Sequence, residues 1–197
     1  LMIDRFQVPC ETIDISGMVD PLIELDPNMS DKRKGNIMAR ARMIALYDRS
    51  EVFKALPIGT SNKTEILLGY STMWGDMAAA LNPIGDLYKT QVRQLARALK
   101  IPDVIIDKPP SADLWLGQTD EGELGFTYEE VDKLLYLLVD HRYSAQECIE
   151  DGFDKHFVHS VLTRVRRSQF KRMMPPIAKV SNRTIGYDFL YLRDWGT

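Results

Sequence analysis

The chain has 197 residues, of which 45% are hydrophobic, and this is enough for one domain with a sizeable core. Its 25 Lys and Arg residues and 28 Asp and Glu residues give a formal net charge of -3, so no overall positive field favours nucleic acid or an anionic membrane. Cys10 and Cys148 form no CxxC or Cys/His cluster, which argues against a disulfide framework or a zinc site. No apolar run has the length of a membrane span. We therefore expect a single, cytoplasmic domain over residues 1–197.

The first part of the chain predicts a strand, a helix and a second strand. Its opening residues read as the end of a helix that leads into a strand-like segment at 11–15, followed by a short helical stretch at 17–25. Apolar residues then recur at helical spacing from 36 to 49, and a short apolar run at 55–58 has the length of a buried strand. This order predicts an α/β fold with a parallel sheet flanked by helices.

Helices predominate in the rest of the chain. Apolar spacing and capping residues predict them at 63–70, 87–99, 127–139, 144–151 and 155–170. The polar stretch from 108 to 125 is long for a loop inside a compact domain, so we expect a lid, a binding loop or a disordered segment there.

Polar groups gather at 58–76, where a predicted strand ends and a helix begins. Open parallel sheets bind their ligands at such points. Thr60 offers a hydroxyl beside backbone N–H groups that can face an anion, and Glu65, one turn further on, offers a carboxylate to a divalent metal. The alternative interpretation is a capped helix with a solvated glutamate.

Four segments resemble the successive signature blocks of the NAD synthetases, in that family's order and spacing. They are GNIMARARM (35–43), GTSNKTEILLGYSTMWGDMA (59–78), NPIGDLYKTQV (82–92) and KPPSADLWLGQTDEGELGFTYEEVD (108–132). The tail SQFKRMMPPIAK resembles the family's basic C-terminal segment, so the resemblance covers essentially the whole chain. It implies a Rossmann-like fold of the adenine-nucleotide alpha-hydrolase type, with a parallel sheet, and a homodimer.

The resemblance implies ATP-dependent amidation of deamido-NAD to NAD, the final step of NAD biosynthesis. A carboxylate resists attack by ammonia until AMP is attached to it, so the reaction proceeds through an adenylate and releases pyrophosphate and then AMP. Because charge builds on phosphate oxygens, we expect catalysis to depend on Mg²⁺, cations and backbone donors. ATP, deamido-NAD and ammonia are the implied partners, and neither nucleic acid nor membrane is expected.

The resemblance also assigns residues to ATP and to the metal. Thr60, Lys89 and Ser111 stand where the family contacts ATP, and Glu65 stands where it ligates magnesium. Simpler alternatives exist for two of them. Lys89 can be an exposed helix charge, and Ser111 can be a loop or helix cap.

Two residues are implied at the deamido-NAD site and one at the ammonia site. Arg40 resembles an arginine that helps to bind deamido-NAD, and Lys171 aligns with the lysine of a His-Lys pair at that site. Asp120 lies in the loop that closes over the substrates in relatives and is the catalytic candidate for ammonia activation. The alternatives are a surface charge for Arg40 and a solvated turn for Asp120.

Three positions depart from the family's pattern. Met73 stands where many ammonia-dependent members have lysine, Ala80 where they have aspartate, and Phe170 where the histidine of the His-Lys pair is found. These departures remove charged contacts to deamido-NAD. Met73 and Ala80 also resemble the glutamine-dependent branch, which leaves the nitrogen donor open between ammonia and glutamine.

The family's SGGxDS pyrophosphate loop does not occur in these 197 residues. Its glycines let backbone N–H groups surround pyrophosphate, and its aspartate holds a metal, so we expect the chain alone to lack half of the ATP site. Either the protein continues upstream of Leu1, or the chain is a truncated, non-catalytic homologue that dimerises or binds nucleotide only. A third alternative, a GMP synthetase or tRNA-thiolating enzyme of the same fold, is opposed by the blocks at 59–92.

Overall fold

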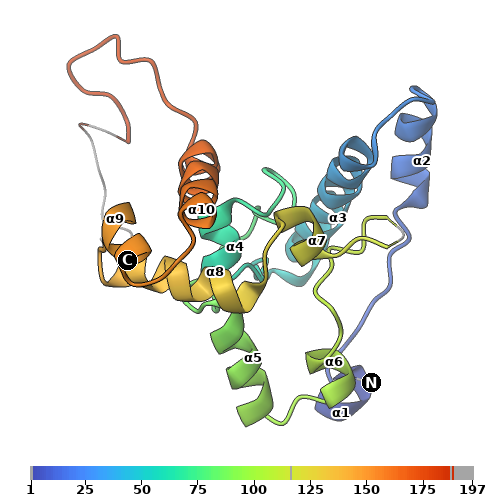
Figure 1. The fold of residues 1–197 in the computed structure, drawn as a ribbon. Coiled ribbons are helices and arrows are strands. Elements are labelled where there is room, and N and C mark those ends of the chain that lie inside the picture. The colour runs from blue at the N-terminus through green and yellow to red at the C-terminus, as the bar shows by residue number, and fades with distance from the viewer. Residues whose placement is uncertain (1, 116, 187, 189–197) are drawn as a thin grey trace, which may run out of the picture.

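The computed structural model describes residues 2–115, 117–186 and 188, and within them every regular element is a helix. The α-helices are α1 (Met2–Phe6), α2 (Ser16–Glu24), α3 (Asp31–Phe53), α4 (Lys63–Leu68), α5 (Lys89–Ala98), α6 (Asp103–Ile106), α7 (Asp120–Leu124), α8 (Tyr128–Leu135), α9 (Ala145–Glu150) and α10 (Lys155–Arg167). A π-helical turn, Tyr136–Asp140, continues α8, and a 3₁₀ turn, Gln169–Arg172, follows α10. Helices α4, α5, α8 and α10 meet at the centre, and α2 packs against α3 (Figure 1).

Side-chain caps explain where several helices begin. Asn62, Thr127 and Ser144 each accept a hydrogen bond from the backbone N–H three residues later, and a glutamate at that position accepts one from the cap residue's own N–H. These reciprocal capping boxes satisfy donors that a helix start leaves free. The predicted starts of α4, α8 and α9 are thereby confirmed.

Helix α3 is longer than its apolar spacing predicts. It begins at Asp31, five residues before the predicted start at 36, and ends at Phe53. Asp31 places a carboxylate in the first turn, where the helix dipole favours negative charge. Lys54 ends the helix in the left-handed conformation, with φ of 51°. Polar residues at both ends are helical here although they lie outside the apolar pattern.

The predicted strands do not form as strands among the described residues. Segment 11–15 is irregular, and segment 55–58 contributes only Ile58, which makes a parallel bridge with Leu81. Around the bridge, Gly59 N donates to Leu81 O at 2.8 Å and Ala80 N donates to Pro57 O at 2.9 Å. A strand needs a neighbour along its length to satisfy its backbone groups, and within the part of the chain that the structure describes only this short contact supplies one.

The core lies between α8 and the helices around it. Tyr128, Val131, Leu134 and Leu135 on α8 are completely buried and belong to one cluster. The other buried members are Leu68, Tyr88, Leu124, Cys148, Val158 and Val161. Burial of each large apolar side chain contributes about 1.5–3 kcal/mol, so this cluster fixes the relative positions of α4, α8, α9 and α10.

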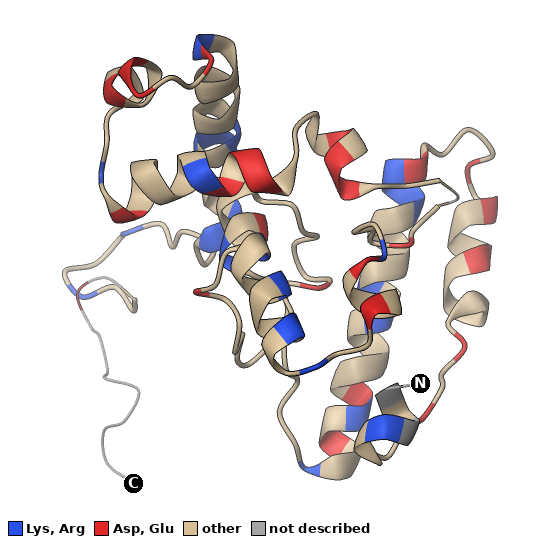
Figure 2. Ribbon diagram, turned by 60° about the horizontal axis from the view of Figure 1, so that its bottom comes forward, with Lys and Arg blue, Asp and Glu red and all other residues tan. Residues whose placement is uncertain are grey.

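Charge is distributed without a dominant face. Acidic and basic residues are interspersed along the helices (Figure 2), in keeping with a formal charge of -3. Among the described residues, no helix combines the length and the apolar character that crossing a membrane requires.

Gly69 tests the packing of α4 on α10. It ends α4 with φ of 63°, and a Cβ there would lie 2.2 Å from Ser168 Cβ. We expect Gly69→Ala to lower the free energy of unfolding by about 2–5 kcal/mol, through backbone strain and overlap together. Urea denaturation measures this change.

Gly125→Ala is the matched control. Gly125 also ends a helix with positive φ, 82°, but a Cβ there would meet nothing within 4 Å. It should cost only the backbone strain, about 1–2 kcal/mol. Equal losses for the two variants would contradict the close approach of α4 and Ser168.

Candidate active site

Lys89 and Glu65 form an ion pair where α4 and α5 begin. The distance from Lys89 Nζ to Glu65 Oε1 is 2.8 Å, and the side chains are only 21% and 15% exposed. Glu65 Oε2 accepts a hydrogen bond from Asn62 N at 3.1 Å, so the carboxylate also completes the cap of α4. Neither group is the solvated charge of the alternative interpretation. Two residues predicted for ATP and for magnesium therefore lie side by side.

Tyr128 connects this pair to Asp120. Lys89 Nζ lies 5.2 Å from the centroid of the Tyr128 ring, close enough for a cation–π interaction. The Tyr128 hydroxyl donates to Asp120 Oδ2 at 2.9 Å. Burial, followed by the charge of Asp120, raises the pKa of Tyr128, so its hydroxyl stays protonated and remains a donor.

Asp120 is buried rather than solvated. It is 5% exposed, and its Oδ1 is buried without a hydrogen-bond partner among the described residues. An unpaired buried oxygen is unfavourable. Asp120 therefore has one acceptor atom available for a ligand that donates hydrogen bonds.

The sequence interpretation missed Tyr70 and Glu123, which border Asp120. The Tyr70 hydroxyl donates to Glu123 Oε2 at 3.2 Å, and Gln118 Nε2 donates to Glu123 Oε1 at 2.9 Å. Burial, together with the charges of Asp120 and Glu123, raises the pKa of Tyr70. The signal that could have indicated both residues is their position inside the blocks 59–78 and 108–132, which resemble the family's signatures.

Thr60 and Ser111 lie in loops. Thr60 is exposed directly after the bridge at Ile58. Ser111 Oγ accepts from Asp113 N at 3.0 Å, which forms a local turn within the loop. Among the described residues, no hydrogen bond joins Thr60 or Ser111 to Lys89 or Glu65.

The residues predicted for deamido-NAD contact the backbone of the segment after α4. Arg40 Nε donates to Met73 O at 3.3 Å from α3. Lys171 Nζ donates to Gly69 O at 2.8 Å and to Ser71 O at 2.6 Å. Burial lowers the pKa of Lys171.

A cavity of about 590 Å³ adjoins Lys171. Basic and polar side chains of α10 form much of its wall, and its lining includes His159, Ser160, Thr163, Arg164, Arg167 and Phe170. Lys171 thus combines a structural role for its ammonium with a position at the edge of a cation-rich cavity.

Comparison with known proteins identifies the family. Residues 1–175 match the family model described as NAD synthase. The chain belongs to the NAD synthase family. The matched residues include helix α3, the Lys89–Glu65 pair and Asp120.

Relatives within this family cover nearly the full chain. The NH(3)-dependent NAD(+) synthetase of Chlorobaculum parvum is 54% identical over 195 residues, which are 99% of this chain and 70% of the relative. The enzyme of the same name from Chlorobium phaeovibrioides is 57% identical, with the same coverage.

Solved structures show the same similarity in space. The NMN synthetase of Francisella tularensis matches with a TM-score of 0.76 and 33% identity, over 90% of this chain and 69% of that one. The NH3-dependent NAD synthetase of Campylobacter jejuni, in complex with a nitrate ion, matches with a TM-score of 0.74 and 31% identity, with equal coverage.

Tyr128→Phe tests the burial of Asp120. The variant keeps the ring and removes the donor to Asp120 Oδ2, which leaves the buried carboxylate without a side-chain donor among the described residues. We expect the free energy of unfolding to fall by about 1.5–3 kcal/mol. Urea denaturation again gives the value.

Tyr70→Phe provides the comparison. It removes the hydroxyl that donates to Glu123 in a more exposed setting, and it should cost about 1 kcal/mol or less. If the two phenylalanine variants lose the same stability, Asp120 is not the buried acceptor described above.

Proposed function

We propose that this protein catalyses the ATP-dependent amidation of deamido-NAD to NAD, with ammonia as the nitrogen donor. The observation that carries the proposal is the Lys89–Glu65 pair beside the buried Asp120, in a chain of the NAD synthase family. ATP activates the nicotinate carboxylate as an adenylate, and pyrophosphate leaves. Ammonia then displaces AMP and forms the amide.

Lys89 is the cation that binds ATP in this proposal. Its Nζ lies 2.8 Å from Glu65 Oε1, and its positive charge favours the negatively charged phosphates of ATP. Phosphate oxygens that replace Glu65 as its partner would keep the ammonium paired. Thr60 and Ser111 contact the nucleotide from the neighbouring loops, which brings hydroxyl donors to the same ligand.

Glu65 is the proposed magnesium ligand. Among the described residues no three His, Cys, Asp or Glu side chains gather into a metal site. Mg²⁺ often takes only one or two protein carboxylates, with substrate phosphates and water as its other ligands, and Glu65 fits that donor set. Bound Mg²⁺ would supply neutralisation of the charge that develops on the phosphates.

Arg40 and Lys171 bind deamido-NAD in this proposal, and Asp120 acts on ammonia. The free Oδ1 of Asp120 can accept an N–H bond from ammonia and hold the proton that the amide nitrogen loses. Its burial keeps bulk water from competing for that atom. This supports a catalytic assignment for Asp120.

Four broader predictions accompany the proposal. Residues 1–197 act as one domain, and the parallel bridge between Ile58 and Leu81 supports the parallel sheet of the family's fold. Homodimerisation and a cytoplasmic location stay predictions from the sequence.

An assay with both nitrogen donors tests the proposed reaction. The full-length protein is incubated with deamido-NAD, ATP and Mg²⁺, and with ammonia or glutamine in parallel, while NAD and AMP are followed. We expect equal amounts of NAD and AMP with ammonia. Substrate binding without AMP formation would instead support a non-catalytic homologue.

A parallel assay with a mononucleotide tests a second candidate substrate. The similarity to an NMN synthetase and the uncharged Met73, Ala80 and Phe170 favour including the mononucleotide counterpart of deamido-NAD. Faster turnover of the mononucleotide would overturn the proposed dinucleotide specificity.

Glu65→Gln tests the metal ligand. The amide keeps the shape and an acceptor for Asn62 N but loses the charge that pairs with Lys89 and would hold Mg²⁺. We expect kcat to fall by about 100-fold or more, a loss comparable to that of one electrostatic catalytic group. Circular dichroism and thermal melting confirm that the variant is folded.

Glu147→Gln is the matched control because Glu147 holds the same capping-box position in α9. Its turnover should equal that of the wild type. Unchanged turnover of Glu65→Gln would remove Glu65 from the metal site.

A further inference from the structure

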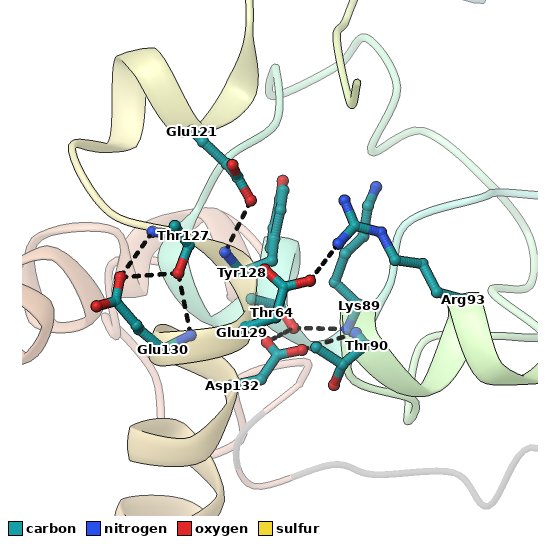
Figure 3. A network of polar contacts seen from close by, with 10 residues as sticks. All are labelled: Thr64, Lys89, Thr90, Arg93, Glu121, Thr127, Tyr128, Glu129, Glu130 and Asp132. Atoms are coloured by element: carbon teal, nitrogen blue, oxygen red, sulfur yellow. Dashed lines mark hydrogen bonds and ion pairs between the residues drawn. The ribbon is translucent and has the colours of Figure 1, made fainter. Parts of the chain in front are cut away.

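The buried carboxylate of Asp132, on α8, accepts hydrogen bonds from the first turns of two other helices, α4 and α5. Asp132 is 4% exposed, and it forms no ion pair with any of the described residues. Its Oδ1 accepts from the Thr64 hydroxyl at 2.5 Å, and its Oδ2 accepts from Thr90 N at 2.8 Å. Figure 3 shows these contacts converging beside Lys89. Hydrogen bonds rather than a paired cation thus satisfy both oxygens.

Helix α5 depends on these contacts for its N-terminus. Its cap residue is Tyr88, whose side chain makes no capping hydrogen bond, although Tyr88 N donates to Gln91 at 2.9 Å. The next two backbone donors point out of α5, because Lys89 N donates to Thr64 Oγ1 at 2.9 Å and Thr90 N donates to Asp132. Asp132 and Thr64 therefore cap α5 from two other helices.

This cap bears directly on the candidate site. Thr64 precedes Glu65 in α4, and Lys89 is the first residue of α5. A single hydroxyl, that of Thr64, joins the backbone of Lys89 to the carboxylate of Asp132. A shift of that hydroxyl would move α4 and α5, which carry Glu65 and Lys89, relative to each other.

We propose that Asp132 is a positioning residue, which acts through Thr64 and the first turn of α5 to hold Lys89 against the nucleotide phosphates. The inference rests on the proposed function, since the role of Lys89 toward ATP comes from there. Asp132 itself touches no substrate. Its buried charge is favoured by the N-terminus of α5, which donates the Thr90 N–H to the carboxylate and presents the positive end of the helix dipole.

Asp132→Asn tests the proposal with little change in volume. The amide cannot accept from both Thr64 and Thr90, because one of its two polar atoms is a donor. We expect the Kd for ATP with Mg²⁺ to rise about tenfold, the effect of losing one charge-assisted hydrogen bond. The Kd for deamido-NAD should stay within about twofold, because Asp132 bonds to Thr64 and Thr90 and not to the residues assigned to that ligand. Isothermal titration calorimetry measures both values.

Thr64 supplies a second pair of variants. Thr64→Val removes the hydroxyl at nearly constant shape and should weaken ATP binding as Asp132→Asn does. Thr64→Ser keeps the hydroxyl and should restore wild-type binding. Loss of affinity in both Thr64 variants would assign the effect to packing and overturn the proposal.

Glu129→Gln is the matched control for the contact between α5 and α8. Glu129 lies one turn before Asp132 on α8 and pairs with Arg93 of α5 (Figure 3). It should bind ATP as the wild type does. The proposal fails if Glu129→Gln and Asp132→Asn weaken ATP equally, if Asp132→Asn leaves ATP binding unchanged, or if it weakens both substrates alike.

Amide hydrogen exchange separates this proposal from the proposed function. The amides of Lys89 and Thr90 should exchange faster in Asp132→Asn than in the wild type or in Glu129→Gln, whatever the protein catalyses. If the wild type binds no ATP, the proposed function fails, and faster exchange at these two amides still establishes the capping role. Unchanged exchange at both amides would refute it.

Discussion

A negative charge inside the core holds the centre of this molecule together. Asp132 lies among apolar residues of α8, where an unpaired carboxylate would be strongly unfavourable. It is tolerated because Thr64 and Thr90 donate to it from the first turns of α4 and α5. The same bonds that make the charge acceptable lock the helix starts to one another, so the geometry of the candidate site follows from satisfying one buried group.

The Lys89–Glu65 ion pair lies beside Asp132, and its two members are also the residues proposed to bind ATP and Mg²⁺. Lys89 and Glu65 neutralise each other at 2.8 Å, and both are proposed to bind parts of the ATP–magnesium substrate. Phosphate oxygens and Mg²⁺ carry charges opposite to those of Lys89 and Glu65, so the substrate can replace each partner without leaving a charge unpaired. Asp120 differs, because its Oδ1 has no hydrogen-bond partner among the described residues. In the proposed site, the two ATP-binding charges are therefore already paired with each other, and the residue assigned to ammonia keeps one acceptor atom available.

Local rules predict much of the helical structure. Asn62, Thr127 and Ser144 start their helices as their capping patterns indicate, since a cap depends on residues only three positions apart. Strands are different. Segments 11–15 and 55–58 have a composition suited to strands. Strand pairing also requires a neighbouring strand, which composition cannot specify. Among the described residues of these two segments, only Ile58 forms a bridge.

The sequence by itself determined the family and the identity of the charged residues, because the blocks around Glu65, Lys89 and Asp120 are contiguous in the chain. Only the tertiary structure decided which of them meet and what surrounds them. Asp132 has the local pattern of an ordinary helix aspartate, and its role depends on donors 68 and 42 residues away. Burial and long-range hydrogen bonding are set by how helices pack, and no local spacing encodes that packing.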